Sequence, residues 1–366
     1  MPQNAHIDLS AHAGFARCFA PAALTVGLIL PLETHPFRAA PTMKDHLAMA
    51  QTAEALGFAS LWMRDIPFYD PDYGDVGQIF EPLTYIAWLA AHTTSIALGT
   101  AGIVLPLREP LLLAKQVTTI DQLSRGRMLL GLSSGDRPSD YPLFGIDMKT
   151  RGERLRDAFS VYRAVSEQCF PVFDSARFGH AEGGLDLVPK PPAGRTPAIA
   201  VGKAQQSVAW IAANMDGFIS TIPLRPDLRA VVDEWHAQTA AAGQDAFKPL
   251  GIGGFVDLVE DRAHPLVRIQ GGIRVGSGAL SDYLQAAKEA GISHLAMNPK
   301  VSRRPYIELM QELASEVLPL FPTPGASVAA DVLAVAGGLN RRPLRLTPGA
   351  CAARVPSASR RRGSVR

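Results

Sequence analysis

Short runs of aliphatic and β-branched residues alternate along the chain with longer amphipathic stretches, and each short run ends in glycine, proline, serine or aspartate. The short runs predict strands buried on both faces, and the stretches between them predict helices. This alternation predicts a parallel sheet covered by helices. The predicted strands are 25–31, 58–65, 96–104, 128–135, 198–202, 217–221, 250–259 and 294–298, and the predicted helices are 42–56, 82–92, 111–123, 153–168, a segment through 210 to 214, 226–242, 279–290 and 304–318.

Eight strand and helix pairs predict one α/β domain, a (β/α)₈ TIM barrel over residues 24–320, preceded by an N-terminal extension over 1–23. Segment 170–192 has Gly183-Gly184 between short apolar runs, which predicts an inserted hairpin. Segment 266–278 is expected to be irregular. Thr42 is expected to cap the first barrel helix, and Gly57 to end it.

Composition separates the barrel from the end of the chain. Of the 366 residues, 47% are hydrophobic and 19% charged, enough for one large core. Residues 332–366 contain eight arginines and no acidic residue, whereas residues 1–331 hold 28 basic and 34 acidic residues, which argues against nucleic acid as a partner of the barrel. The basic, low-complexity segment 321–366 is predicted to be a disordered tail. An RNA- or lipid-binding arm is the less favoured interpretation.

Cysteine and hydropathy patterns indicate a cytoplasmic protein. Cys18, Cys169 and Cys351 lie far apart without a C-x-x-C pair, so neither a disulfide framework nor a zinc site is indicated. The first 24 residues lack the apolar run of a signal peptide, and no stretch reaches the roughly 18 apolar residues of a membrane span. No paired-histidine metal motif occurs. Six histidines are interpreted as surface or cap residues: His35, His46, His92, His180, His236 and His294.

The active site of a TIM barrel lies at the carboxyl ends of its strands. After the fifth barrel strand, Lys203 and Ser207 stand before a helix, where a charge, a hydroxyl and free N–H groups suit a phosphate. The equally weighted alternative is that Ser207 and the neighbouring glutamines only cap the helix. Gly276-Ser277-Gly278 is a rival cradle without a nucleotide-binding motif.

Other strand ends carry further candidates. Asp65 is the tentative catalytic residue, with an ion pair to Arg64 or Arg108 as the alternative. The long loop 66–80 and the segment 136–143 are expected to line the substrate pocket. The pocket residues expected from them are Ile66, Tyr69, Tyr73, Asp136 and Arg137.

Strand 96–104 carries small residues where a barrel strand usually presents bulky ones, so something is expected to pack against its backbone. The chain shows no G-x-S-x-G elbow and no other set of nucleophile, base and metal ligands. A barrel of this kind is expected to take its chemistry from a cofactor.

Several stretches resemble the luciferase-like flavin monooxygenase family over about residues 24–320. They are LGTAGIVLP at 98–106, DQLSRGR at 121–127, FGIDM at 144–148, and EALGF at 54–58 before Leu61-Trp62. The resemblance implies a barrel that binds reduced flavin mononucleotide (FMN), supplied by a separate reductase, and uses O₂ to oxidise a small organic substrate through a flavin hydroperoxide. A homodimer is expected.

The resemblance also implies a role for each part of the site. The flavin ring would lie near Thr100, Ala101 and Gly102, with a non-prolyl cis peptide at Ala101-Gly102. Ser133 and Ser134 would approach the flavin. The phosphate would be held by the loop that contains Gly202, Lys203, Ala204, Gln206 and Ser207.

Two departures from the family pattern keep alternatives open. Ile66 stands where luciferase has a catalytic histidine, and Ser134 stands where it has a phosphate-binding arginine. The luciferase reaction itself is therefore not expected, and Lys203 becomes the main positive partner of the phosphate. The alternatives are an F420-dependent enzyme that transfers hydride, and a flavin-binding barrel or subunit with little catalysis.

Overall fold

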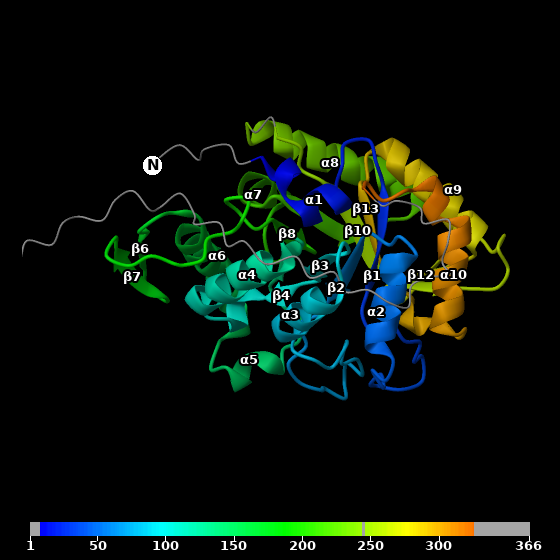
Figure 1. Ribbon diagram of the computed structural model, residues 1–366, viewed down its shortest axis with the longest axis horizontal. Helices are drawn as coiled ribbons and strands as arrows, with labels where there is room; N and C mark the ends of the chain where they lie inside the picture. Colours follow the sequence, from blue (N-terminus) through cyan, green and yellow to red (C-terminus); the bar gives the residue numbers. More distant parts are fainter. Residues whose placement is uncertain (1–7, 244–245, 326–366) are drawn as a thin grey trace, which may run out of the picture.

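The computed structural model describes residues 8–243 and 246–325. Eight parallel strands form a closed barrel in the order β1, β2, β3, β5, β8, β9, β10 and β13, and β13 pairs again with β1 (Figure 1). The prediction of a (β/α)₈ barrel is confirmed. The strands are β1 (Thr25–Ile29), β2 (Ser60–Met63), β3 (Ala97–Thr100), β5 (Met128–Ser133), β8 (Ala198–Val201), β9 (Gly217–Thr221), β10 (Leu250–Leu258) and β13 (His294–Asn298).

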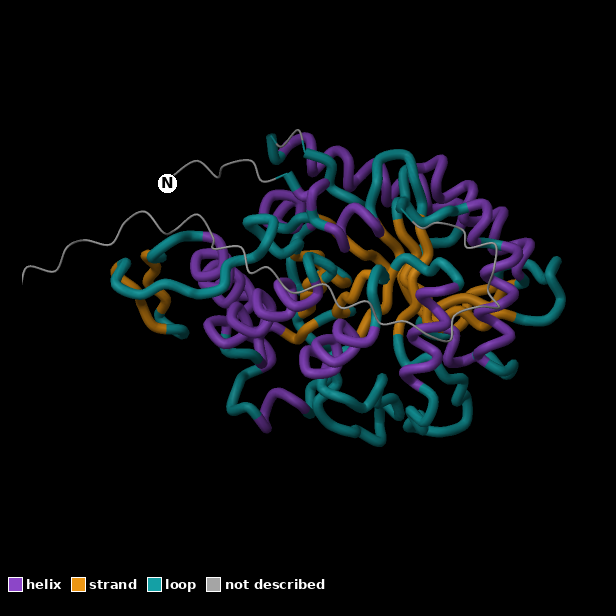
Figure 2. Tube along the Cα trace, in the orientation of Figure 1, coloured by secondary structure: helices purple, strands orange, loops and turns teal. Residues whose placement is uncertain are grey.

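Helices surround this barrel, as the purple segments around the orange strands in Figure 2 show. They are α2 (His46–Ala55), α3 (Pro82–His92), α4 (Pro110–Ser124), α6 (Arg151–Glu167), α7 (Val208–Asn214), α8 (Leu228–Ala241), α9 (Ser277–Ala290) and α10 (Tyr306–Glu316). A short helix, α1 (Ala13–Cys18), covers the amino-terminal end, where the Gly14 N–H donates to the carbonyl of Gly126 at 2.8 Å.

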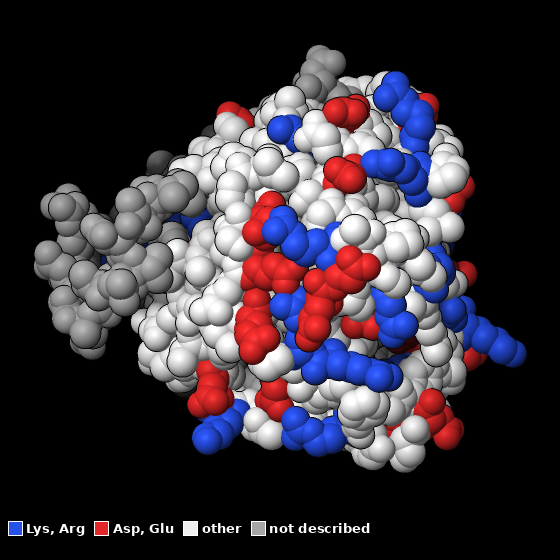
Figure 3. All heavy atoms as spheres, turned by 90° about the vertical axis from the view of Figure 1, so that its right-hand side faces the viewer, with Lys and Arg blue, Asp and Glu red and all other residues white. Residues whose placement is uncertain are grey.

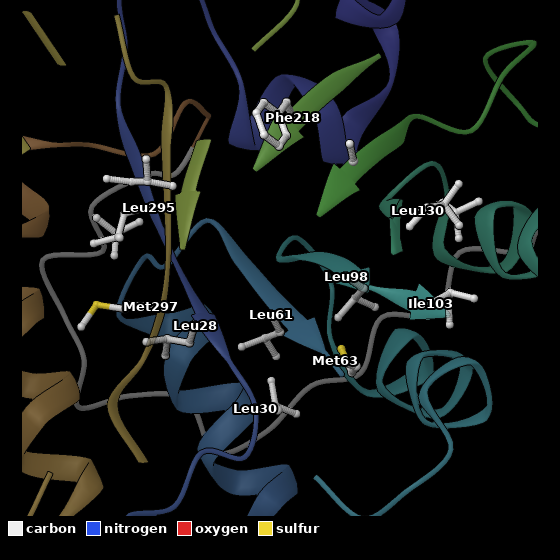
Figure 4. Packing of buried hydrophobic residues seen from close by; sticks show 14 of the residues in the cluster. Leu28, Leu30, Leu61, Met63, Leu98, Ile103, Leu130, Phe218, Leu295 and Met297 are labelled. Carbon is white, nitrogen blue, oxygen red and sulfur yellow. The ribbon is translucent and has the colours of Figure 1, made fainter. Parts of the chain in front are cut away.

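Side chains on each strand alternate between the barrel interior and the helix layer. Leu28 and Leu61 belong to the large cluster between strands and helices, part of which Figure 4 shows. Ile29 and Trp62, one residue further on, belong instead to a second cluster inside the barrel, together with Phe15 of α1. The residues before the first strand therefore complete the core at the bottom of the barrel.

The small residues of strand 96–104 have two different neighbours. A Cβ atom at Gly99 would lie 2.3 Å from the ring of Trp62, a fully buried side chain on the adjacent strand. At Gly102 it would lie 3.0 Å from the backbone of Gly131. Gly99 is therefore small because Trp62 fills the barrel interior there, which hydrophobic periodicity did not reveal.

Several local predictions are confirmed. The inserted hairpin exists as β6 (Val172–Ser175) and β7 (Gly179–Glu182), an antiparallel pair that lies beside α6 (Figure 1). Its turn is at 176–178, however, and Gly183-Gly184 follows β7 instead of joining the two strands. Ser207 is the N-cap of α7, as in the alternative to its phosphate-binding role, and its hydroxyl accepts from the Trp210 N–H at 3.1 Å.

Other local predictions were wrong. Thr42 does not cap a helix, because its hydroxyl donates to Glu33 at 2.8 Å and α2 begins at His46. Strand 96–104 is divided into β3 and β4 (Ile103–Val104). Segment 266–278 is not irregular: β11 (Val267–Ile269) and β12 (Gly272–Val275) form a hairpin, and β12 extends the sheet beside β10.

Cys18 is buried and free. The predicted disorder of the tail concerns residues that lie, from 326 onward, outside the described part of the chain. The face in Figure 3, on the side of α9 and α10, carries acidic and basic side chains close together rather than a stripe of one sign.

Candidate functional site

A cavity of about 590 Å³ opens at the carboxyl ends of β2, β3, β5 and β8. This is the end of the barrel at which the sequence placed the site. Twelve of the predicted site residues border the cavity: Asp65, Ile66, Ala101, Gly102, Ser133, Ser134, Asp136, Arg137, Gly202, Lys203, Ala204 and Gln206. Four others do not border it: Thr100, Ser207, Tyr69 and Tyr73.

The loop 202–206 has the backbone of an anion-binding nest. Gly202, Ala204 and Gln205 have left-handed φ angles of 63°, 49° and 59°. In the described chain, the N–H groups of Lys203, Ala204 and Gln205 have no hydrogen-bond acceptor, and the exposed Lys203 ammonium has no partner. Successive free N–H groups beside a lysine form a concavity suited to an anion.

Gln206 fixes this loop rather than presenting a free amide to the cavity. Its Nε2 donates to the carbonyls of Gly152 at 2.9 Å and Ala204 at 3.2 Å, and its Oε1 accepts from Arg156 at 2.9 Å. A Cβ at Gly152 would lie 3.2 Å from Gln205, so the start of α6 packs closely against the loop. The loop conformation is therefore supported by a second element.

The middle wall of the cavity is nearly without side chains. Ala101 and Gly102 line it, and the peptide bond between them is cis, as predicted. The Ser133 hydroxyl donates to the Gly102 carbonyl at 3.2 Å. Thr100 is fully buried and donates to the Gly131 carbonyl at 2.7 Å, so its hydroxyl ties β3 to β5.

Asp65 borders the cavity and is also ion-paired. Its carboxylate accepts from Arg108 Nη2 at 2.5 Å, and it accepts from the Val104 N–H at 2.9 Å. Of the two ion pairs weighed from the sequence, the one with Arg108 is present, whereas Arg64 pairs with Asp75. The carboxylate of Asp65 thus joins the end of β2 to the start of β4.

The two predicted substrate loops are bound to each other above the barrel. Tyr73 is 42% exposed, and its hydroxyl donates to the Asp136 carbonyl at 2.8 Å. Arg137 Nη2 donates to the Asp75 carbonyl at 2.6 Å, and the Ser139 hydroxyl donates to a carboxylate oxygen of Asp70. Tyr73 therefore shapes the pocket indirectly, while Tyr69, 56% exposed, lies outside the cavity lining.

Asp75 anchors loop 66–80 to the barrel, which sequence reasoning missed. Its carboxylate pairs with Lys300 after β13 at 2.5 Å and with Arg64 after β2. Burial alone would raise the pKa of Asp75, but the two cations outweigh it and hold this pKa well below its ordinary value. The only sequence signal was an acidic residue in a long loop, because Lys300 lies far away in the chain.

The rival phosphate cradle is filled by the protein itself. The Gly276 N–H donates to the His264 carbonyl at 3.0 Å, and the Gly278 N–H donates to the Arg262 carbonyl at 3.0 Å. A Cβ at Gly276 would lie 2.1 Å from the Asp261 carbonyl oxygen. No room for a phosphate is left between these backbone segments.

Two of the histidines interpreted as surface or cap residues are buried. His294 is fully buried inside the barrel, where Nε2 accepts from the Trp62 indole N–H at 3.1 Å and Nδ1 lies 2.7 Å from the Thr25 hydroxyl. Burial lowers the pKa of His294 to about 3. His35 is also buried, with 5% exposure, so neither residue lies on the surface.

Within residues 8–243 and 246–325, no group of three histidine, cysteine or acidic side chains is placed to hold a metal ion. No helix in the same residues is long and apolar enough to cross a membrane.

Comparison with known proteins establishes the family. Residues 24–264 match the luciferase-like monooxygenase family, which is about two thirds of the chain. The chain belongs to this family. Limonene 1,2-monooxygenase of Rhodococcus erythropolis is 31% identical over 115 residues, which are 31% of this chain and 28% of that enzyme.

Solved structures agree on the fold. The monooxygenase RslO1 from Streptomyces bottropensis superposes with a TM-score of 0.64 and 18% identity, covering 81% of this chain and 99% of that one. An F420-dependent secondary alcohol dehydrogenase superposes with a TM-score of 0.66 and 18% identity, covering 81% and 98%. The fold is therefore shared with proteins described as a monooxygenase and as an F420-dependent dehydrogenase.

Proposed function

We propose that this chain is a flavin-dependent oxidoreductase, a monooxygenase that uses reduced FMN and O₂ to oxidise a small organic substrate. One observation carries the proposal. Three backbone N–H groups and the Lys203 ammonium, none of which has a partner among the described residues, stand at one end of a cavity, and the adjoining wall at Ala101 and Gly102 has no side chain larger than a methyl group. A phosphate at the loop and a flat ring on the wall match this shape.

The residues present fit FMN chemically. The nest formed by residues 202–206 donates hydrogen bonds to phosphate oxygens, and Lys203 adds a positive charge. Gln206 and Gly152 hold that nest in place, and Ser133 fixes the carbonyl of Gly102 on the wall. Reduced FMN, when bound, supplies the electrons that activate O₂.

Asp65, the predicted catalytic residue, is proposed here as a positioning residue. Its carboxylate is held by Arg108 and by the Val104 N–H, which leaves it poorly placed to accept a proton from a substrate. It would set the position of β4 beside the cavity wall. A separate flavin reductase and a homodimeric assembly stay predictions.

The proposal is tested by binding oxidised FMN, riboflavin and F420 to the purified chain and recording absorbance and fluorescence. Riboflavin lacks the phosphate, so FMN is expected to bind about tenfold tighter or better, because hydrogen bonds to a charged group contribute about 1.5–3 kcal/mol. Lys203→Ala should reduce this difference in affinity between FMN and riboflavin. Lys44→Ala, which removes another exposed lysine, should leave it unchanged.

Two results would redirect the proposal. Tight binding of F420 with weak binding of FMN would assign the chain to F420-dependent hydride transfer instead. Tight FMN binding, with reduced FMN consumed in air at the same rate in the presence and absence of aldehydes, alcohols and ketones, would favour a flavin-binding barrel with little catalysis. Equal affinities for FMN and riboflavin would contradict the phosphate site.

A further inference from the structure

Two buried charged side chains on one wall of the cavity have unused hydrogen-bonding capacity. Arg137 and Asp140 are each 5% exposed, and both border the cavity. Asp140 is the first residue of the short helix α5 (Asp140–Leu143). Arg137 Nη2 donates to the Asp75 carbonyl, and the guanidinium carbon lies 5.0 Å from the centre of the Tyr73 ring. Its other terminal nitrogen, Nη1, is buried without a hydrogen-bond partner.

The Asp140 carboxylate is the matching acceptor. In the described chain it makes no hydrogen bond and no ion pair, and sequence reasoning did not single it out. Burial raises the pKa of Asp140, and Arg137 partly opposes this effect. Two neighbouring polar groups of the cavity are engaged: Asp65 binds Arg108, and the Tyr141 hydroxyl donates to the Ser134 carbonyl.

The position of the pair suits a substrate rather than the cofactor phosphate. The phosphate loop follows β8, whereas the Arg137 side chain reaches loop 66–80, which follows β2. Strands β3 and β5 lie between β2 and β8 in the barrel. A cofactor that extends from the loop to the wall at Ala101 and Gly102 would leave the Arg137 end of the cavity open.

The chemistry of the pair selects the kind of ligand. A buried donor or charge without a partner costs free energy, so a pure hydrocarbon would leave both groups unsatisfied. An anionic group would meet repulsion from Asp136 and Asp140, and a cationic group from Arg137. A hydroxyl can accept from Arg137 and donate to Asp140, and a carbonyl oxygen can accept from both when Asp140 is protonated.

We propose that Arg137 and Asp140 form a polar subsite that binds the hydroxyl or carbonyl oxygen of a neutral substrate. This inference rests on the proposed function, because it names the substrate class of the same cavity. Such a subsite would distinguish this chain from an enzyme whose substrate is a hydrocarbon, because a hydrocarbon has no oxygen to bind there.

The experiment measures ligand binding by calorimetry to the chain loaded with oxidised FMN, which does not turn over. The probes are cyclohexanol, cyclohexanone, methylcyclohexane and cyclohexanecarboxylate. Cyclohexanol and cyclohexanone are expected to bind at least about tenfold tighter than methylcyclohexane, because a site built to hydrogen-bond an oxygen rejects an analogue without it. Arg137→Met and Asp140→Asn should each reduce this preference, whereas the exposed controls Arg229→Met and Asp282→Asn should not.

A pH series adds a result that a purely structural role would not give. Cyclohexanone should bind more tightly as the pH falls through the pKa of Asp140, because only the protonated carboxyl donates to a ketone. Cyclohexanol should change less, and Asp140→Asn should remove the pH effect. The charged groups that act on Asp140 are Arg137, Asp65, Asp70 and Asp136, so the series is repeated in Asp136→Asn, which should shift the profile without abolishing it.

The outcomes separate this inference from the proposed function. Equal binding of cyclohexanol and methylcyclohexane, or a preference unchanged in both variants, would overturn the subsite even if FMN binds. Preferred binding of the carboxylate would overturn it in favour of an anion site. If FMN does not bind, the proposed function fails, and the same probes on the cofactor-free chain still decide the subsite. If Arg137→Met does not fold, Asp140→Asn and the pH series decide alone.

Discussion

Replacing Gly99 by alanine tests why strand β3 is made of small residues. A methyl group there would lie 2.3 Å from two ring carbons of Trp62, well inside contact distance. The indole cannot move away freely, because it is fully buried and its N–H donates to His294 at 3.1 Å. Overpacking of a dense core costs about 1–3 kcal/mol.

This cost should lower the apparent midpoint of thermal unfolding by roughly 2–12 °C, at about 2–4 °C per kcal/mol for a domain of this size. Gly184→Ala is the matched control, because Gly184 has no atom within 4 Å of the added Cβ and its φ is not left-handed. The midpoint of that variant should stay within error or rise slightly. Both midpoints are measured by circular dichroism at one scan rate.

Trp62→Phe should partly relieve the strain in Gly99→Ala, so the double variant should be more stable than the sum of the single changes predicts. FMN affinity should change little in Gly99→Ala once unfolding is taken into account, since the cavity wall begins at Ala101. An unchanged midpoint together with weakened FMN binding would refute the reasoning. This result would show that position 99 has no side chain because the cofactor, and not the Trp62 ring, needs the space.

Three further predictions concern the site and its support. Ser134→Ala should weaken FMN binding less than Lys203→Ala, measured by fluorescence titration at low salt; equal losses, or none for Lys203, would contradict the phosphate assignment. Arg64 and Lys300 hold the pKa of Asp75 below its unfolded value. The Asp75 carboxylate therefore stabilises the fold above about pH 4, and it stabilises the fold less as the pH falls. Asp75→Asn should therefore lower the free energy of unfolding at pH 7 by roughly 1–4 kcal/mol. In this variant, the urea concentration at the midpoint of unfolding should also fall less steeply as the pH is lowered. Burial lowers the pKa of His294 to about 3, so its imidazole should stay neutral in NMR spectra from pH 8 to pH 4. A titration near pH 6.5 would contradict its place in the core.

Much of the fold followed from local pattern. Strand β9 and helix α3 have the predicted bounds, because buried aliphatic runs and Pro at a helix start are strong local signals. The hairpin of β11 and β12 was missed, because its pairing with β10 depends on the sheet already being formed. His294 could have been placed in the barrel interior, because alternate side chains of a strand point to the same face. It stands two residues before Ala296, whose side chain lies in that interior.

The two halves of the cavity differ in how far sequence can determine them. The half proposed to bind the cofactor consists mainly of backbone: left-handed residues at 202, 204 and 205, and the peptide between Ala101 and Gly102. Such conformations are fixed by short local segments, so both segments could be proposed from the sequence, and the cis peptide between Ala101 and Gly102 is confirmed. The half proposed to bind the substrate is made by side chains from separate loops, such as Arg137, whose partner Asp75 is in turn held by Lys300. These contacts exist only once the barrel has closed and brought the loops together. Substrate choice can therefore diverge while the cofactor site keeps its pattern, and it has to be determined from the assembled cavity.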